Sequence, residues 1–229
     1  GQDKLPSPAE IQKRIDDALK EVNRQMSTYQ TDSEISQFNQ LRTVNQAMPI
    51  SQDFAYVTGE ALRLNKLTHG ALDVTVGPLV NLWGFGPQKE ITHEPTVQEI
   101  QHASEMVGTD KLKLSQDGQQ PTLAKTHPEV YLDLSSIAKG FGVDKTAAEL
   151  EKLNIGNYLV EIGGELHGKG HNAQGNPWRI GIEQPNIVQG GTTQITIPLD
   201  NKSLATSGDY RIFHVDKSGR RLSHIINPK

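Results

Sequence analysis

The hydrophobic period of this chain changes part-way along its length, and this change constrains the fold more than any other feature. Through the first half, apolar residues recur every three or four positions, which is the spacing of one helix face. From Lys111 onward they recur at alternate positions, which is typical of half-buried strands. Helices combined with mostly antiparallel strands predict an α+β layered domain. At 229 residues, we expect a single domain over residues 1–229.

Three helices are predicted before the change of period. Ser7-Pro8-Ala9-Glu10 is a capping box with proline at the first helical position, so a helix begins at Pro8 and ends near Ser27. A second helix is predicted from Gln52 to His69, with Gly70 as its stop. Its inward face is Phe54, Val57, Ala61, Leu64 and Leu67. A third begins at the capping box that opens with Thr96.

The strand-like part contains one further helix. Lys111–Leu114 and Thr122–Ala124 flank a polar turn and predict a hairpin. Ser135 and Ser136 are expected to cap a helix over residues 137–153. The remaining predicted strands are Val130–Leu134, Tyr158–Ile162, Trp178–Ile182 and Thr192–Leu199.

Composition excludes several classes of function. The chain has no cysteine, which rules out disulfides, thiolate zinc sites, iron–sulfur clusters and cysteine nucleophiles. Its net charge is −4 without a basic run, so we expect no nucleic-acid partner. His167 and His171 are four residues apart in a glycine-rich stretch, where ordinary loop histidines are a better interpretation than a zinc pair.

Four segments combine glycine, small hydroxyl residues and isolated charges. In the first, Tyr29 follows a helix end, where its ring either stacks on a flat ligand or is a partly buried structural residue. In the second, Gly70–Pro87, Asp73 lies within an apolar run and either meets a ligand donor or caps a turn. Gly84 and Gly86 do not form a dinucleotide fingerprint, because the third glycine and the following helix are missing.

The other two segments carry charge near a predicted helix and near the chain end. Asp133 is delivered to a helix N-terminus, an anion-binding position, and Lys139 adds a cation; the alternative is a well-capped helix. His224, which follows the Thr206–Arg211 turn, is either a general base or phosphate contact, or a structural histidine bonded to backbone. The Gly163-Gly164 turn is interpreted as structural. Together the four segments suggest a site for a large, flat, phosphorylated ligand.

Taken in order, these segments resemble the ApbE family of FAD:protein FMN transferases. The matching elements are residues 26–39, Gly70 to Pro87, Asp133 to Gly142, Gly163-Gly164, residues 206–210 and His224 to Pro228. The resemblance covers nearly the whole chain and implies a T-fold-like α+β architecture, with a mixed sheet packed by helices. It also implies Mg²⁺-dependent transfer of FMN from FAD, through a phosphoester, to a threonine or serine of a target flavoprotein, with release of AMP.

The resemblance also implies site residues and partners. It implies FAD contacts at Tyr29, Ala71, Leu72, Asp73, Asp133, Lys139 and Ile226, a Mg²⁺ ligand at Ser136, and a catalytic role for His224 in activating the incoming hydroxyl. The implied acceptors are flavin-carrying subunits of respiratory electron-transfer complexes. The implied location is the periplasmic side of the bacterial inner membrane, through a lipid anchor outside this sequence.

The resemblance departs from the family pattern at both ends. The family's opening strand, with a methionine that contacts FAD, and its closing segment, with an acidic metal ligand, have no counterpart in residues 1–229. We therefore expect these 229 residues alone to bind FAD weakly and to transfer little FMN. Alternative functions are an FAD pyrophosphatase, a non-enzymatic flavin-binding module and a plain solute-binding lipoprotein.

Overall fold

The computed structural model describes residues 6–86, 93–183, 193–208, 212–216 and 218–228. The chain divides into two compact units, each described by itself below. Unit 1 comprises Gly1–Glu21 and Lys139–Arg211, and unit 2 comprises Val22–Ala138 and Ile212–Lys229. Two helices continue across the division: α1 (Pro8–Met26) and α6 (Ser135–Lys152). No helix formed by the described residues is both long and apolar enough to span a bilayer.

Unit 2 is mainly helical, and side-chain caps fix where its helices begin. Its complete helices are α2 (Glu34–Gln40), α3 (Gln52–Leu67), α4 (Gly77–Leu82), α5 (Val97–Glu105) and the 3₁₀ turn η1 (Thr109–Lys111). Ser33 and Ser51 accept hydrogen bonds from the third residue beyond them, and so cap α2 and α3. Thr96 and Glu99 form the complete capping box of α5. Gly70, with a φ of 82°, ends α3 by donating to the carbonyl of Asn65.

Two small antiparallel sheets complete unit 2. The first has the order β1-β3-β2 and contains β1 (Met48–Pro49), β2 (Leu112–Ser115) and β3 (Thr122–Lys125). The second pairs β9 (Phe213–Val215) with β10 (Arg221–Ser223). The core of unit 2 is fully buried aliphatic and aromatic residues from the helices, β3 and the segment before α6: Ile35, Phe38, Phe54, Val57, Leu123, Val130, Leu132 and Leu134.

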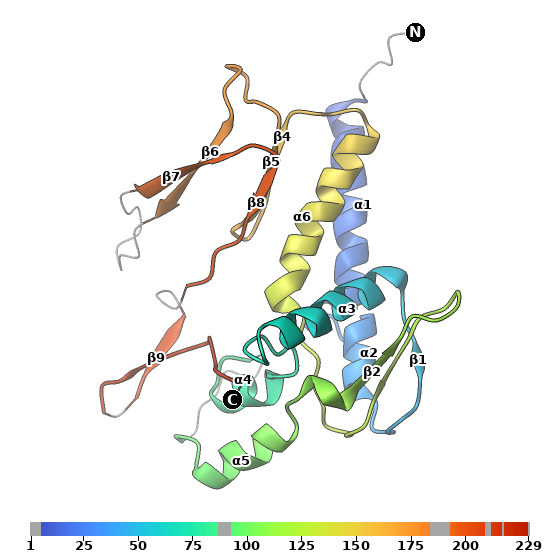
Figure 1. Ribbon diagram of the computed structural model, residues 1–229, viewed down its shortest axis with the longest axis vertical. Coiled ribbons are helices and arrows are strands. Elements are labelled where there is room, and N and C mark those ends of the chain that lie inside the picture. The colour runs from blue at the N-terminus through green and yellow to red at the C-terminus, as the bar shows by residue number, and fades with distance from the viewer. Residues whose placement is uncertain (1–5, 87–92, 184–192, 209–211, 217, 229) are drawn as a thin grey trace. The chain divides into compact units, whose positions relative to one another are not determined.

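Unit 1 contains a helix pair and two antiparallel sheets. Helices α1 and α6 run alongside each other (Figure 1), and Gly142 of α6 approaches Leu19 of α1 closely enough that an added Cβ would lie 3.5 Å from its side chain. The sheets are β4-β5-β8 and β6-β7, formed by β4 (Tyr158–Ile162), β5 (Glu165–Lys169), β6 (Trp178–Glu183), β7 (Thr193–Leu199) and β8 (Lys202–Leu204). Val143, Ala147 and Leu150 of α6 pack against Tyr158 and Val160 of β4.

Most sequence-based element predictions are confirmed. The helix beginning at Pro8, the capped helix after Thr96, the hairpin of β2 and β3, and the strand Tyr158–Ile162 are present. The α+β class is also confirmed. The expected mixed sheet is not: every strand pairing among the described residues is antiparallel, both between strands joined by a turn, such as β2 and β3, and between strands far apart in the chain, such as β1 and β3.

Three local predictions are wrong, and helix α2, over residues 34–40, was not predicted. Val130–Leu134 shows alternating burial but forms no strand, because both backbone groups of Leu132, at its centre, bond to the side chain of Asn39. Helix α6 begins at Ser135, so the two serines lie inside it and the Asp133 carboxylate accepts the Ser135 N–H instead. Leu67 is 63% exposed rather than inward-facing, because it is the last residue of α3.

One cation is buried in the core of unit 2. Lys125 is 1% exposed. Its ammonium donates to the carbonyls of Asn39 and Val130 at 3.3 and 3.2 Å and lies 5.2 Å from the centre of the Phe38 ring. These partners are neutral, and burial, with a smaller contribution from Arg42, lowers the pKa of Lys125 to about 8. Below a pH of about 8, the folded protein therefore buries a charged ammonium group whose hydrogen-bond partners are neutral.

This burial predicts a pH dependence of stability. The pKa of Lys125 falls from 10.5 to about 8 on folding, so between these values the unfolded chain binds more protons and the free energy of unfolding rises with pH. The rise attributable to Lys125 is at most about 3 kcal/mol and is absent below pH 8. Lys125→Met should abolish it in urea titrations from pH 7 to 10.5. Lys113→Met, which changes an exposed lysine on the paired strand, should keep it; an equal loss in both variants would contradict the assignment.

Candidate functional site

The segment before α6 places Asp133 at a helix start. Val130, Leu132 and Leu134 are buried, so the alternate residues Tyr131 and Asp133 face away from the core. The N–H of Asp133 donates to the carbonyl of Val74 at 2.8 Å. One carboxylate oxygen, Oδ1, accepts the N–H of Ser135 at 2.8 Å. The segments that carry Asp73 and Asp133 are thus joined by a backbone hydrogen bond.

The loop after α3 holds Ala71, Leu72 and Asp73. The N–H groups of Ala71 and Leu72 donate to the carbonyl and hydroxyl of Thr68 at 3.1 Å each. Asp73 Oδ1 accepts the backbone N–H of Thr75 at 2.8 Å and also its hydroxyl. The turn-capping interpretation of Asp73 is therefore confirmed. The proposed contact with FAD is a separate prediction, and Asp73 Oδ2, with one long 3.5 Å contact to Asn65, is the oxygen left for it.

Tyr29 lies in the loop between α1 and α2 and is 85% exposed. The interpretation of Tyr29 as a partly buried structural residue is therefore wrong. Tyr131 links this loop to the Asp133 segment. Its side chain forms a hydrogen bond with Thr28 and interacts electrostatically with Tyr29 and Asp133. Burial and the Asp133 carboxylate raise the pKa of Tyr131.

His224 follows β10 and is held by a backbone group. Its Nδ1 lies 3.2 Å from the carbonyl of Ile212. Because a carbonyl only accepts, this contact is a hydrogen bond when Nδ1 carries the proton, and in that neutral tautomer Nε2 has a lone pair that can accept one. The ring centroid lies 6.4 Å from that of Phe85, which stacks on His214 at 4.5 Å. The structural interpretation of His224 is confirmed, and its role as a general base stays a prediction.

The chain end that carries Ile226 belongs to unit 2, as do all the other candidate residues except Lys139. Ile226 is half-buried, whereas Ile225 beside it is 55% exposed. The Thr206–Arg211 turn is only partly visible, because Asp209, Tyr210 and Arg211 lie outside the described residues, as does Pro87.

The donor set for a metal is incomplete among the described residues. Ser136 lies exposed in the first turn of α6, and its hydroxyl makes no hydrogen bond with any described residue. Asp133, three residues earlier, has Oδ2 available. Mg²⁺ prefers six oxygen ligands in octahedral geometry. No group of three or more His, Asp or Glu side chains gathers in the described part of the chain, so these two residues do not by themselves make a magnesium site.

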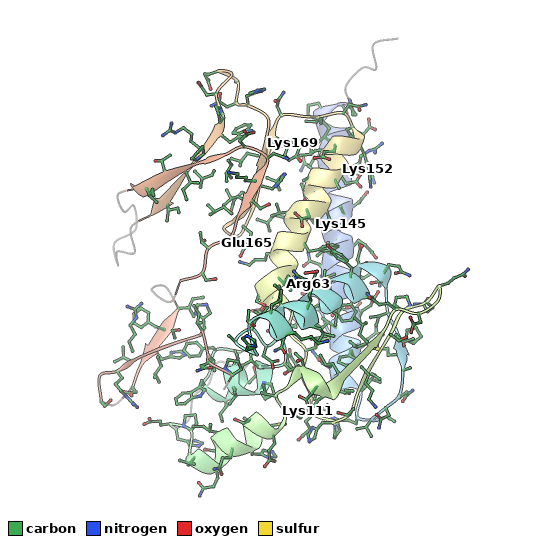
Figure 2. All side chains as sticks on the ribbon, viewed as in Figure 1. Arg63, Lys111, Lys145, Lys152, Glu165 and Lys169 are labelled. Carbon is green, nitrogen blue, oxygen red and sulfur yellow. The ribbon has the colours of Figure 1, made fainter. Side chains whose placement is uncertain are left out.

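Lys139 is the first residue of α6 assigned to unit 1. Its ammonium lies 2.7 Å from Glu165 Oε2 and donates to the carbonyl of Gly163 at 3.1 Å. Glu165, labelled in Figure 2, begins β5. Its side chain is 15% exposed. The φ of 56° at Gly163 favours glycine, and a Cβ there would lie 3.3 Å from the Lys139 stem. The lysine therefore lies beside a carboxylate and donates one N–H to a backbone carbonyl, which leaves N–H groups for a ligand oxygen.

A pocket of about 430 Å³ opens in unit 2 beside Tyr131. Its lining is mostly hydroxyl and amide side chains: Thr28, Thr31, Ser36, Asn39, Gln40, Arg42, Pro78, Asn81, Met106, Glu129, Val130 and Tyr131. None of these residues is among the nine candidates. The pocket is therefore not the candidate site. It lies next to that site, because Tyr131, which lines the pocket, is also close to Tyr29 and Asp133.

Comparison with known proteins identifies the family. Residues 2–229 match the family model described as the ApbE family. The chain belongs to the ApbE family. This ApbE-family chain is 53% identical over 215 residues to a FAD:protein FMN transferase of Haemophilus influenzae and 50% identical over 218 residues to one of Vibrio cholerae.

These matches cover 94% and 95% of the ApbE-family chain but 62% and 63% of the two relatives, so it spans less than two thirds of the length of the curated relatives. A solved structure, the flavin transferase ApbE from Vibrio cholerae, is 47% identical with a TM-score of 0.86. That comparison covers 100% of this chain and 70% of the other. The expected α+β architecture of the family is thereby confirmed.

Several residues that shape the candidate site of this ApbE-family chain were not predicted from the sequence. The carbonyl of Ile212 orients His224, Glu165 pairs with Lys139, and Phe85 lies beside both histidines. Backbone carbonyls leave no sequence signal. Glu165 did carry a sequence signal, because an acidic residue beside a glycine pair needs a partner when it is buried.

The close approach of Gly77 to Tyr131 gives a prediction. A Cβ at Gly77 would lie 2.5 Å from Tyr131 Cδ1, so the ring must move to admit it. Gly77→Ala should lower the free energy of unfolding by about 1–3 kcal/mol in urea denaturation, since overpacking displaces a fixed ring. Gly140→Ala is the control: no atom lies within 4 Å of its Cβ, and it should raise stability by up to about 1 kcal/mol in the helix. Equal stability of the two variants would contradict this packing.

Proposed function

We propose that this protein transfers FMN from FAD to a threonine or serine of an acceptor protein and releases AMP. The observation that carries the proposal is its membership of the ApbE family, together with 53% identity over 215 residues to a relative named FAD:protein FMN transferase. The exposed Tyr29 ring supports it as a platform for the isoalloxazine. Ala71, Leu72, Asp73, Asp133, Lys139 and Ile226 are proposed as the other FAD contacts.

The proposed step is a phosphoryl transfer on the diphosphate of FAD. The acceptor hydroxyl oxygen attacks the phosphorus on the FMN side, and a new P–O bond forms. The P–O bond to the AMP phosphate breaks, and AMP leaves with the electron pair. His224 Nε2 takes the hydroxyl proton, which the Ile212 carbonyl makes feasible by holding the other ring nitrogen protonated. Lys139 places its remaining N–H on a phosphate oxygen.

The proposal includes Mg²⁺ because the family resemblance implies it. Ser136 is the proposed ligand, with its hydroxyl exposed at the start of α6. A bound ion of this kind neutralises negative charge on phosphate oxygens. The described residues supply too few ligands to define its geometry, so the proposed step above uses the chain's own groups.

The proposed acceptors are flavin-carrying subunits of respiratory electron-transfer complexes. The proposed location is the periplasmic side of the inner membrane, with a lipid anchor outside this sequence. Both rest on the family resemblance.

An assay with FAD, Mg²⁺ and an acceptor domain tests the proposal. The protein, at its full encoded length, should release AMP and leave in-gel flavin fluorescence on the acceptor. An acceptor with its threonine changed to valine is the control and should remain dark. AMP and free FMN without any acceptor would indicate a pyrophosphatase instead. FAD binding without AMP would indicate a flavin-binding module, and neither binding nor product would overturn the flavin assignment.

His224→Gly separates chemistry from binding. The rate of FMN transfer should fall by about 10²–10⁴-fold, since a positioned general base contributes that much. The Kd for FAD should stay within about threefold of wild type, because the base acts on the acceptor's proton rather than on the flavin. Added imidazole should restore part of the rate. Equal losses in rate and affinity would show that His224 positions FAD instead.

A further inference from the structure

Asn39 pairs with a core segment as a strand would. Its side-chain Nδ2 donates to the carbonyl of Leu132 at 2.8 Å, and its Oδ1 accepts the N–H of the same residue at 2.8 Å. Two such bonds to one residue reproduce the closely spaced pair of an antiparallel ladder. Asn39 is 8% exposed and Leu132 is fully buried, so water cannot replace either bond.

This pairing holds the middle of the segment that presents Asp133. Val130, Leu132 and Leu134 are buried at 1% exposure or less, and Asp133 lies on the opposite face. The side-chain period of an extended chain is two residues, so a slip by one residue at Leu132 would turn Asp133 towards the core. The backbone bond from Asp133 to Val74 fixes one side of the segment, and Asn39 fixes the other.

Asn39 is itself immobilised. Its own carbonyl accepts Lys125 Nζ at 3.3 Å and Arg42 at 3.2 Å. It lies in the last turn of α2, and the same helix reaches the Tyr29 loop through Ser36, whose hydroxyl donates to the carbonyl of Ser27 at 3.4 Å. Helix α2 therefore joins the loop that carries Tyr29 to the segment that carries Asp133.

We propose that Asn39 is a positioning residue for the flavin site, which sets the register of Asp133 through its two bonds to Leu132. This inference rests on the proposed function, because it takes Asp133 to contact FAD. A purely structural asparagine would contribute to stability alone, whereas a positioning residue changes affinity through the group that it positions.

The test is the affinity of the protein, at its full encoded length, for FAD. Asn39→Asp keeps the shape and the acceptor for the Leu132 N–H but opposes the Leu132 carbonyl with a second oxygen. It should weaken FAD binding at least tenfold in fluorescence titrations. Asn45→Asp makes the same chemical change at an exposed residue whose Oδ1 accepts Lys113, and should stay within twofold. Val57→Ala, a buried core change in α3, should lose stability with unchanged affinity.

A double-mutant cycle supplies the decisive readout. In an Asp133→Ala background, Asn39→Asp should cost no more than about twofold, because the group through which it acts is gone. The same loss in both backgrounds, or a loss equal to that of Asn45→Asp, would overturn the proposal while the flavin function stands. If wild type does not bind FAD, both fall together. Should Asn39→Asp not fold, Asn39→Ser removes the Leu132 pairing without a buried charge and enters the same cycle.

Discussion

The backbone hydrogen bond from Asp133 to Val74 is the interaction on which the candidate site depends. It joins segments almost sixty positions apart in the sequence, at the point where each carries an acid that the family resemblance assigns to FAD. Neither segment is a strand, so this bond is not one of a series between paired strands. The bond to Val74, the two hydrogen bonds between Asn39 and Leu132, and the buried side chains of Val130, Leu132 and Leu134 therefore define where Asp133 lies.

Buried polar groups, rather than secondary structure, hold the irregular parts of unit 2 in place. Lys125 and Asn39 satisfy carbonyl and N–H groups that would otherwise be buried without partners, each costing about 1–3 kcal/mol. A buried lysine without a carboxylate is expensive, which its lowered pKa reflects. The buried lysine and Asn39 bond to the backbone of residues 130–134, which forms no strand. Asp133 of this segment is only half-buried.

Local sequence predicted the elements whose signals are themselves local. The helix start after Ser7, the capping box at Thr96, and the turn between β2 and β3 depend on residues within a few positions of each other, and they were predicted correctly. Helix α2 was missed because its seven residues are too short to show a clear period. Val130–Leu134 alternates like a strand, but alternation reports only which side is buried and not what supplies the hydrogen bonds.

The sequence by itself determined the class of fold, the family and the identities of the candidate residues, because periodicity, caps and ordered motifs are written in the order of side chains. It also left open two interpretations for Asp73, His224 and Tyr29. Only the tertiary structure shows what these side chains contact within the chain. Asp73 accepts the Thr75 hydroxyl, His224 lies beside the Ile212 carbonyl, and the Tyr29 ring is 85% exposed, which excludes the buried interpretation. A carbonyl has the same identity at every position, so its place in space, and with it the orientation of His224, is fixed by the folded chain alone.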